Sequence, residues 1–245
     1  MLQLKFPINR VIFLYSLATF GTLIACYFIS ETESDYIHEF PRDYTTNTAR
    51  RYPEAIIFRY GMVGTSFALN LVFALIFSWM KKKARDIDYG GCIPQPLKLI
   101  SIFGFFCEFW TTATIDVSFR MKWHGISAFT FFGCIFPTIG FVTLTICFMR
   151  RNNSFFISSF AYWMKVAICW FLLYANAVSF CGFFLKFPVK KTVLVSIDEW
   201  FCLYGLVFWM CTFIEDFRKV YFFLDVETFE LKIVEIEEDK RKERR

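Results

Sequence analysis

The sequence has few of the residue patterns that enzymes use for chemistry. It holds 2 His, and it contains no CxxC pair, no zinc-ligand spacing and no paired-His metal motif. Glycine-rich phosphate loops and the GxSxG and HExxH motifs are also absent. Basic residues are not interleaved with aromatic residues as they are on nucleic-acid-binding faces. The sequence therefore predicts no metal, no cofactor and no nucleic-acid partner, and it favours a protein that is not an enzyme.

Apolar residues are abundant instead. The chain of 245 residues is 56% hydrophobic, contains 35 Phe and has a mean hydropathy of +0.44. Charged residues bracket six apolar runs, each close to the ~20 residues that a helix needs to cross a bilayer. The sequence predicts an all-α polytopic membrane protein, a bundle of six transmembrane helices within residues 1–217. The expected spans are about 11–30, 55–80, 98–116, 125–149, 161–185 and 197–217, with an exterior loop at 31–54.

Basic residues predict the orientation of this bundle. The N-terminus, the 81–98 loop, the 150–151 turn and the tail hold 17 Lys and Arg, whereas the opposite loops hold 8. Since basic loops stay on the cytosolic side, we expect both termini in the cytosol. The tail, 218–245, is expected to be a charged, solvated and partly helical cytosolic segment, or alternatively a basic cluster on anionic lipid. Nothing in the sequence indicates the oligomeric state.

One acidic residue is expected deep in the membrane. Glu108 lies near the middle of the third run, where an acid costs about 2.5–3.5 kcal/mol to insert. It must be protonated, paired or facing a wet cavity, so it is a candidate for a lipid site or for structural hydrogen bonding. Lys165 is a candidate partner for Glu108, although a snorkelling anchor is the favoured interpretation.

Polar residues also stand at the expected membrane rims. His124 opens the fourth run on the exterior side and, with Asp116 and Glu199, could form a polar cluster there. His124 is the only catalytic candidate, because His titrates near neutrality. The same cluster could bind a lipid headgroup or hold helix ends together, and the residues leave these alternatives open.

The last run carries acids at both ends. Asp198 and Glu199 precede it, and Glu215 and Asp216 follow it. The simplest interpretation is that Glu215 and Asp216 only mark the cytosolic end of the span. Trp200 and Trp209 are expected to anchor this span at the two interfaces.

Several short motifs together resemble a known superfamily. Pro53-Glu54 before the second span and the ending TFIEDFRK (212–219) resemble DRAM-type autophagy modulators. Glu108, the sequence YWMK (162–165) and the short 185–196 loop are more similar to the post-GPI-attachment-to-proteins factor and the FGF-receptor-activating protein. His124, Glu199 and Asp216-Phe217 resemble both branches, and the order of these motifs along the spans is similar as well.

The resemblance implies one of two functions. The first is an accessory factor for lipid remodelling of GPI anchors in the Golgi or ER membrane, with membrane lipids, GPI anchors or a remodelling enzyme as partners. The second is a DRAM-like modulator of autophagy in the lysosomal or plasma membrane. A membrane enzyme that modifies lipids through His124 is a third possibility. The candidate lipid or headgroup cavity is formed by Glu108, His124 and Glu199.

Overall fold

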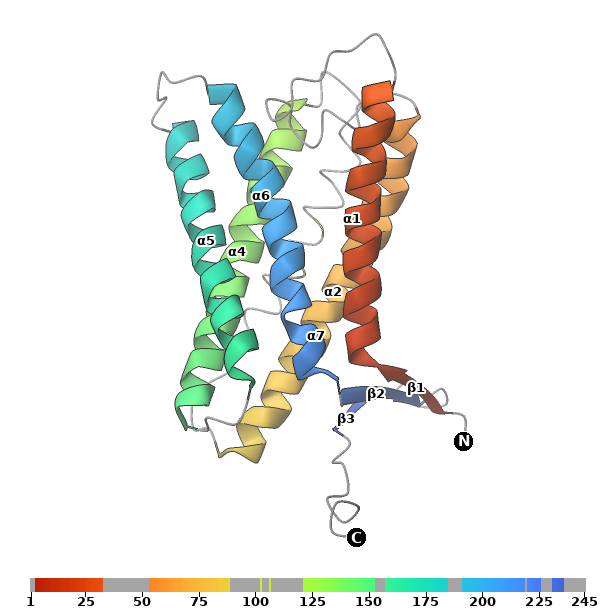
Figure 1. Cartoon of the computed structure of the whole chain (residues 1–245), viewed down its shortest axis with the longest axis vertical. Coiled ribbons are helices and arrows are strands. Elements are labelled where there is room, and N and C mark those ends of the chain that lie inside the picture. Colours follow the sequence, from red (N-terminus) through yellow and green to blue (C-terminus); the bar gives the residue numbers. More distant parts are fainter. Residues whose placement is uncertain are drawn as a thin grey trace.

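The computed structural model contains long helices packed side by side, with a small sheet across one end (Figure 1). It describes residues 3–32, 53–88, 102, 106, 121–152, 157–184, 191–218, 220–225 and 231–235. The helices are α1 (Ile8–Thr32), α2 (Glu54–Asp86), α4 (Met121–Asn152), α5 (Ser159–Phe184), α6 (Lys191–Cys211) and α7 (Phe213–Asp216).

Within the described residues, four helices are long and apolar enough to cross a membrane. Their apolar segments are Ile8–Ile29, Ala55–Asp86, Ile126–Arg151 and Ser159–Val178. The prediction of a helical integral membrane protein is thereby confirmed. The expected third span, 98–116, lies outside the described residues apart from 102 and 106.

Two helices have boundaries that differ from the expected spans. α2 continues past residue 80 through the basic run Lys81–Arg85, because a helix need not stop where it leaves the lipid. α6 begins at Lys191, before the expected start at 197, and ends at Cys211. A separate short helix, α7, follows after Thr212.

The helices pack in a defined order (Figure 1). α1 packs along α2, α4 packs along α5, and α6 contacts both α1 and α5. The α1–α2 interface is close at Gly61, where an added Cβ would lie 2.9 Å from Cβ of Thr22. Small residues allow helix backbones to approach in this way inside membranes. One aromatic pair at the α5–α6 interface is Phe171 and Phe201, whose ring centroids lie 5.6 Å apart.

Buried side chains form two clusters. The larger joins all of the described helices at the end of the bundle that carries the sheet and in its middle, and it includes Phe73, Trp79, Trp209 and Phe217. The smaller lies toward the other end and contains Leu23, Cys26, Phe58, Met62, Trp200 and Leu203. Buried hydroxyls such as Ser66 donate to carbonyl oxygens of their own helix, so they do not remain unsatisfied in the apolar interior.

The helical fold also carries a small three-stranded antiparallel sheet, which is not predicted from the sequence. Its strands are β1 (Gln3–Pro7), β2 (Val220–Asp225) and β3 (Leu231–Glu235), in the order β1-β2-β3. The expectation of a partly helical tail is therefore wrong for the two segments that form β2 and β3. Since β1 leads into α1 and pairs with β2 after α7, the first and last described elements meet at the same end of the bundle.

Candidate functional site

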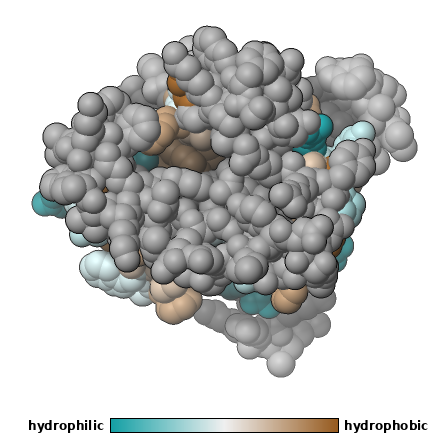
Figure 2. Space-filling view, turned by 90° about the horizontal axis from the view of Figure 1, so that it is seen from above, coloured by the Kyte–Doolittle hydropathy of each residue, from teal (hydrophilic) through white to brown (hydrophobic). Residues whose placement is uncertain are grey.

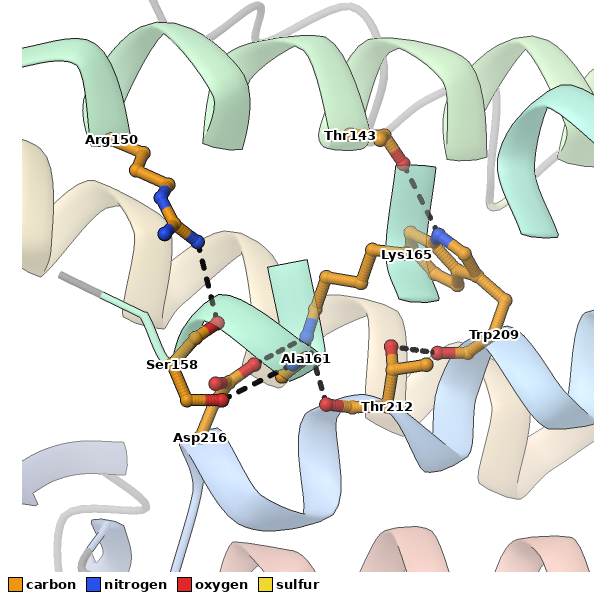
Figure 3. Close-up of polar contacts among 8 residues, drawn as sticks. All are labelled: Thr143, Arg150, Ser158, Ala161, Lys165, Trp209, Thr212 and Asp216. Atoms are coloured by element: carbon orange, nitrogen blue, oxygen red, sulfur yellow. Dashed lines mark hydrogen bonds and ion pairs between the residues drawn. The ribbon is translucent and has the colours of Figure 1, made fainter. Parts of the chain in front are cut away.

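A buried ion pair lies where α5 meets α7. Lys165 is 0% exposed, and its Nζ lies 2.5 Å from Oδ2 of Asp216, whose side chain is 3% exposed. The same Nζ donates a hydrogen bond to the carbonyl oxygen of Thr212 at 2.8 Å. It also lies 4.2 Å from the centroid of the Phe213 ring. The ammonium is therefore surrounded by a carboxylate, a carbonyl and an aromatic face (Figure 3).

The break between α6 and α7 creates this geometry. Thr212 stands between the two helices, and its amide is shared between the carbonyl oxygens of Phe208 and Trp209, both at 3.2 Å. Its hydroxyl donates to the carbonyl of Trp209 at 2.6 Å. The carbonyl of Thr212 is thus turned toward Lys165, and α7 brings Asp216 to the same ammonium (Figure 3).

Aromatic rings hold α7 against the bundle. Phe213 and Phe217 are both 0% exposed, and their rings stack with centroids 5.8 Å apart. Trp79 of α2 meets the Phe217 ring edge-on at 5.0 Å. The Phe213 ring lies against the ammonium, and the burial of both side chains makes the attraction between the two charges stronger than it would be at the surface.

A second polar contact lies deeper in the bundle. Nε1 of Trp209 donates to Oγ1 of Thr143 at 3.1 Å, and this bond links α6 to α4 (Figure 3). Trp209 is 0% exposed, so the expectation that it anchors the span at a lipid interface is wrong. Trp200 is also buried, at 6% exposed, and stacks on Tyr204.

The two acids that end the last apolar run have different environments. Glu215 points outward and faces Arg218 at 3.6 Å, and both side chains are more than half exposed. Asp216 instead points inward to Lys165. The interpretation of both as rim markers therefore fails for Asp216, and the snorkelling interpretation fails for Lys165.

The start of α5 carries another polar group of residues. Arg150 donates to Oγ of Ser159 at 2.8 Å and lies 4.2 Å from the centroid of the Tyr162 ring. Oγ of Ser158 accepts the amide of Ala161 at 3.2 Å and caps the helix, as Ser commonly does. These contacts orient the first turn of α5, so that Lys165 one turn later faces the bundle.

The structure gives less information about the other predicted site residues. His124 lies in α4 and Glu199 in α6, but their side chains are outside the described part of the structure. Glu108 and Asp116 also lie outside it. α4 and α6 both begin at the end of the bundle opposite the sheet, whereas Lys165 and Asp216 lie near the sheet (Figure 1).

The starts of α4 and α6 thus lie at the opposite end of the bundle from the pair of Lys165 and Asp216. Viewed from the end opposite the sheet, some of the described residues that can be seen are hydrophobic (Figure 2). Pro53 stands at the N-cap of α2, and Glu54 is the first residue of that helix.

In the described residues, no group of three His, Cys, Asp or Glu side chains is close enough to hold a metal ion.

A comparison of the sequence with known protein families finds a match. Residues 8–220 match the family described as Frag1/DRAM/Sfk1/Cwh43P N-terminal domain. The chain belongs to this family. The match begins with α1 and ends at Val220, so it includes both partners of the buried ion pair. Searches of curated proteins and of solved structures found no match.

Proposed function

We propose that this chain is a non-catalytic multi-pass membrane factor that assists lipid remodelling of GPI anchors while GPI-anchored proteins mature and are transported. Its partners are membrane lipids, and among them GPI anchors or an enzyme that remodels them. It acts in the Golgi or ER membrane. The observation that carries this proposal is the buried contact between Lys165 and Asp216.

The contact joins two of the motifs noted in the sequence. Lys165 ends the sequence YWMK, which is similar to the GPI-remodelling branch, and Asp216 belongs to the Asp-Phe pair shared by both branches. Each charge is neutralised by the other and shielded from water, so neither group is available to a substrate. This supports a role in holding helices together, as expected for a scaffold or lipid-presenting factor.

Lipid binding is assigned to the opposite end of the bundle. We place a headgroup cavity at Glu108, His124 and Glu199, open to the leaflet away from the sheet. The beginnings of α4 and α6 at that end support this placement for the elements that carry His124 and Glu199. An ionisable residue inside the membrane is a functional candidate by default, and the sequence predicts that Glu108 is such a residue.

A cellular rescue assay tests the proposal. Cells that lack the protein should release a GPI-anchored reporter into the medium or carry an altered anchor lipid, and the wild-type chain should restore both. Glu108→Gln should be expressed at the normal level but fail to rescue. Glu215→Gln, which changes an exposed acid outside the cavity, is the matched control and should rescue fully. An unchanged reporter and anchor in the deletion cells would exclude GPI remodelling.

A DRAM-like modulator of autophagy in the lysosomal or plasma membrane is the second candidate. The family match supports the DRAM-type family, and the ending TFIEDFRK, which resembles that branch, forms the α7 turn and supplies Asp216. Autophagic flux in the same deletion cells separates the two functions. Altered flux with a normal anchor lipid would support the DRAM-like function.

A further inference from the structure

The small sheet has two chemically different faces. Partners across an antiparallel sheet share a face, and residues along a strand alternate between faces. The register therefore gives one face, here called the inner face, on which every residue except Glu235 is apolar: Leu4, Phe6, Val220, Phe222, Leu224, Leu231, Ile233 and Glu235. The other, outer face combines polar and apolar residues: Gln3, Lys5, Pro7, Tyr221, Phe223, Asp225, Lys232 and Val234.

Two residues of the inner face have different surroundings. Val220 is 1% exposed and belongs to the main buried cluster of the bundle, so the inner face is turned toward the helices. Phe6 shares this face but is 41% exposed. The inner face is therefore covered near α7 and partly exposed at Phe6.

The outer face has the character of a surface that meets water. Lys5 is exposed, and its Nζ lies 4.3 Å from the centroid of the Tyr221 ring and 5.7 Å from that of Phe223. A lysine above two rings covers their apolar surface and keeps its charge solvated.

The sheet is attached at the boundary of the membrane-spanning region. The first apolar segment begins at Ile8, the residue directly after β1. The strands lie across the ends of the helices and extend past α1 (Figure 1). An apolar face at this level, turned toward the helices and reaching beyond them, is suited to contact with lipid around the bundle.

We propose that the inner face of the sheet rests on the lipid leaflet beside α1, with its apolar residues in the boundary between headgroups and acyl chains. The occupant of this surface is the bilayer that holds the helices, rather than a second protein. The continuity of β1 with α1 and the burial of Val220 carry the assignment. Contact between the sheet and the lipid then fixes how deeply α1 and α7 lie in the membrane. This placement is independent of the proposed function in lipid remodelling.

Adjacent residues of β2 provide a matched test. Phe222→Cys and Phe223→Cys replace the same residue type on opposite faces of one strand. Each full-length variant is labelled with an environment-sensitive fluorophore and reconstituted in nanodiscs of phosphatidylcholine, with or without brominated acyl chains. The unsubstituted protein, labelled in parallel, corrects for native cysteines. Monodisperse elution in size-exclusion chromatography shows that each variant is folded, and Phe6→Cys with Lys5→Cys gives a second matched pair.

The expected difference follows from the depth of an interfacial element. Such elements bury their apolar face about 5–10 Å into the boundary region, so bromolipid quenching at 222 should exceed that at 223 about twofold or more. Iodide in the water should quench the label at 223 more strongly than that at 222. Equal bromolipid quenching at the two positions would overturn the proposal. A label at 222 that neither quencher reaches would also overturn it, because protein would then cover the inner face.

Discussion

Lys165 and Asp216 are separated by 51 positions in the sequence, yet Nζ of one lies 2.5 Å from Oδ2 of the other inside the bundle. The pair connects α5 to the short helix α7 at the end that carries the sheet. Because α7 is followed directly by the segment that leads to β2, the pair also fixes where the sheet begins.

Breaking this ion pair from one side should destabilise the protein strongly. Lys165→Met leaves the carboxylate of Asp216 buried without its partner, and loss of one partner of a buried pair typically costs about 3–5 kcal/mol. The double variant Lys165→Met/Asp216→Leu removes both charges and should recover most of the lost stability. Thermal unfolding followed by fluorescence-detected size exclusion measures both effects. A double variant less stable than either single variant would contradict the structural role.

Arg218→Ala is the matched control for that experiment. It removes an ion pair with Glu215 in the same part of the chain, but both partners are exposed. Exposed pairs contribute about 0.2–1 kcal/mol, so the melting temperature should change little. A loss comparable to that of Lys165→Met would show that position along the chain, rather than burial, determines the effect.

The α1–α2 contact should be sensitive to the size of one glycine. In Gly61→Ala the added Cβ would overlap the side chain of Thr22, and overpacking of this kind typically costs about 1–3 kcal/mol. Gly64→Ala places a methyl group one turn later on the same helix, where nothing lies within 4 Å. The thermal stabilities of the two variants should therefore differ clearly. Equal stabilities would mean that α1 and α2 are not packed as described.

The hydrogen bond from Trp209 to Thr143 should couple α6 to α4. In a double-mutant cycle of Trp209→Phe and Thr143→Val, we expect a coupling free energy of about 0.5–1.5 kcal/mol, the usual contribution of one hydrogen bond. Thr138→Val serves as the control, because the Thr138 hydroxyl bonds to the Cys134 carbonyl of its own helix. The losses of stability caused by Thr138→Val and Trp209→Phe should therefore add. A coupling free energy between these two substitutions as large as that for Thr143→Val would contradict a specific hydrogen bond between Trp209 and Thr143.

Glycosylation mapping tests the proposed orientation, in which the sheet end faces the cytosol. Ala49→Thr creates the acceptor sequence Asn-Thr-Thr at residue 47, in the connection between α1 and α2. Since that connection leaves α1 at the end opposite the sheet, the variant should gain a glycan. A sequon appended after Arg245 should remain unmodified. Modification of the appended site instead of residue 47 would reverse the orientation.

The positions of the helices could largely be inferred from charge and hydropathy, whereas their contacts could not. Runs of apolar residues between charges indicate α1, α2, α4 and α5, because crossing lipid requires an uninterrupted apolar helix. The same rule placed the end of α2 too early, since the basic run Lys81–Arg85 ends a span but does not end a helix.

The ion pair and the sheet depend on tertiary contacts that local patterns do not contain. Lys165 within an apolar run looks the same whether it snorkels or pairs, and only the register of α5 against α7 decides between them. β1 consists of five residues whose partners lie more than 200 positions away, so its pairing is not visible locally. The alternation of apolar and polar residues in Leu4, Lys5 and Phe6 was the available signal for a strand.

The most direct test of the account is mass spectrometry of the anchor lipid on a GPI-anchored reporter in cells lacking this protein. The account predicts an altered anchor lipid, restored by the wild-type chain and by Lys165→Met/Asp216→Leu, because the pair serves structure rather than chemistry. Glu108→Gln should fail to restore it. An anchor lipid that is identical with and without the protein would contradict the central claim.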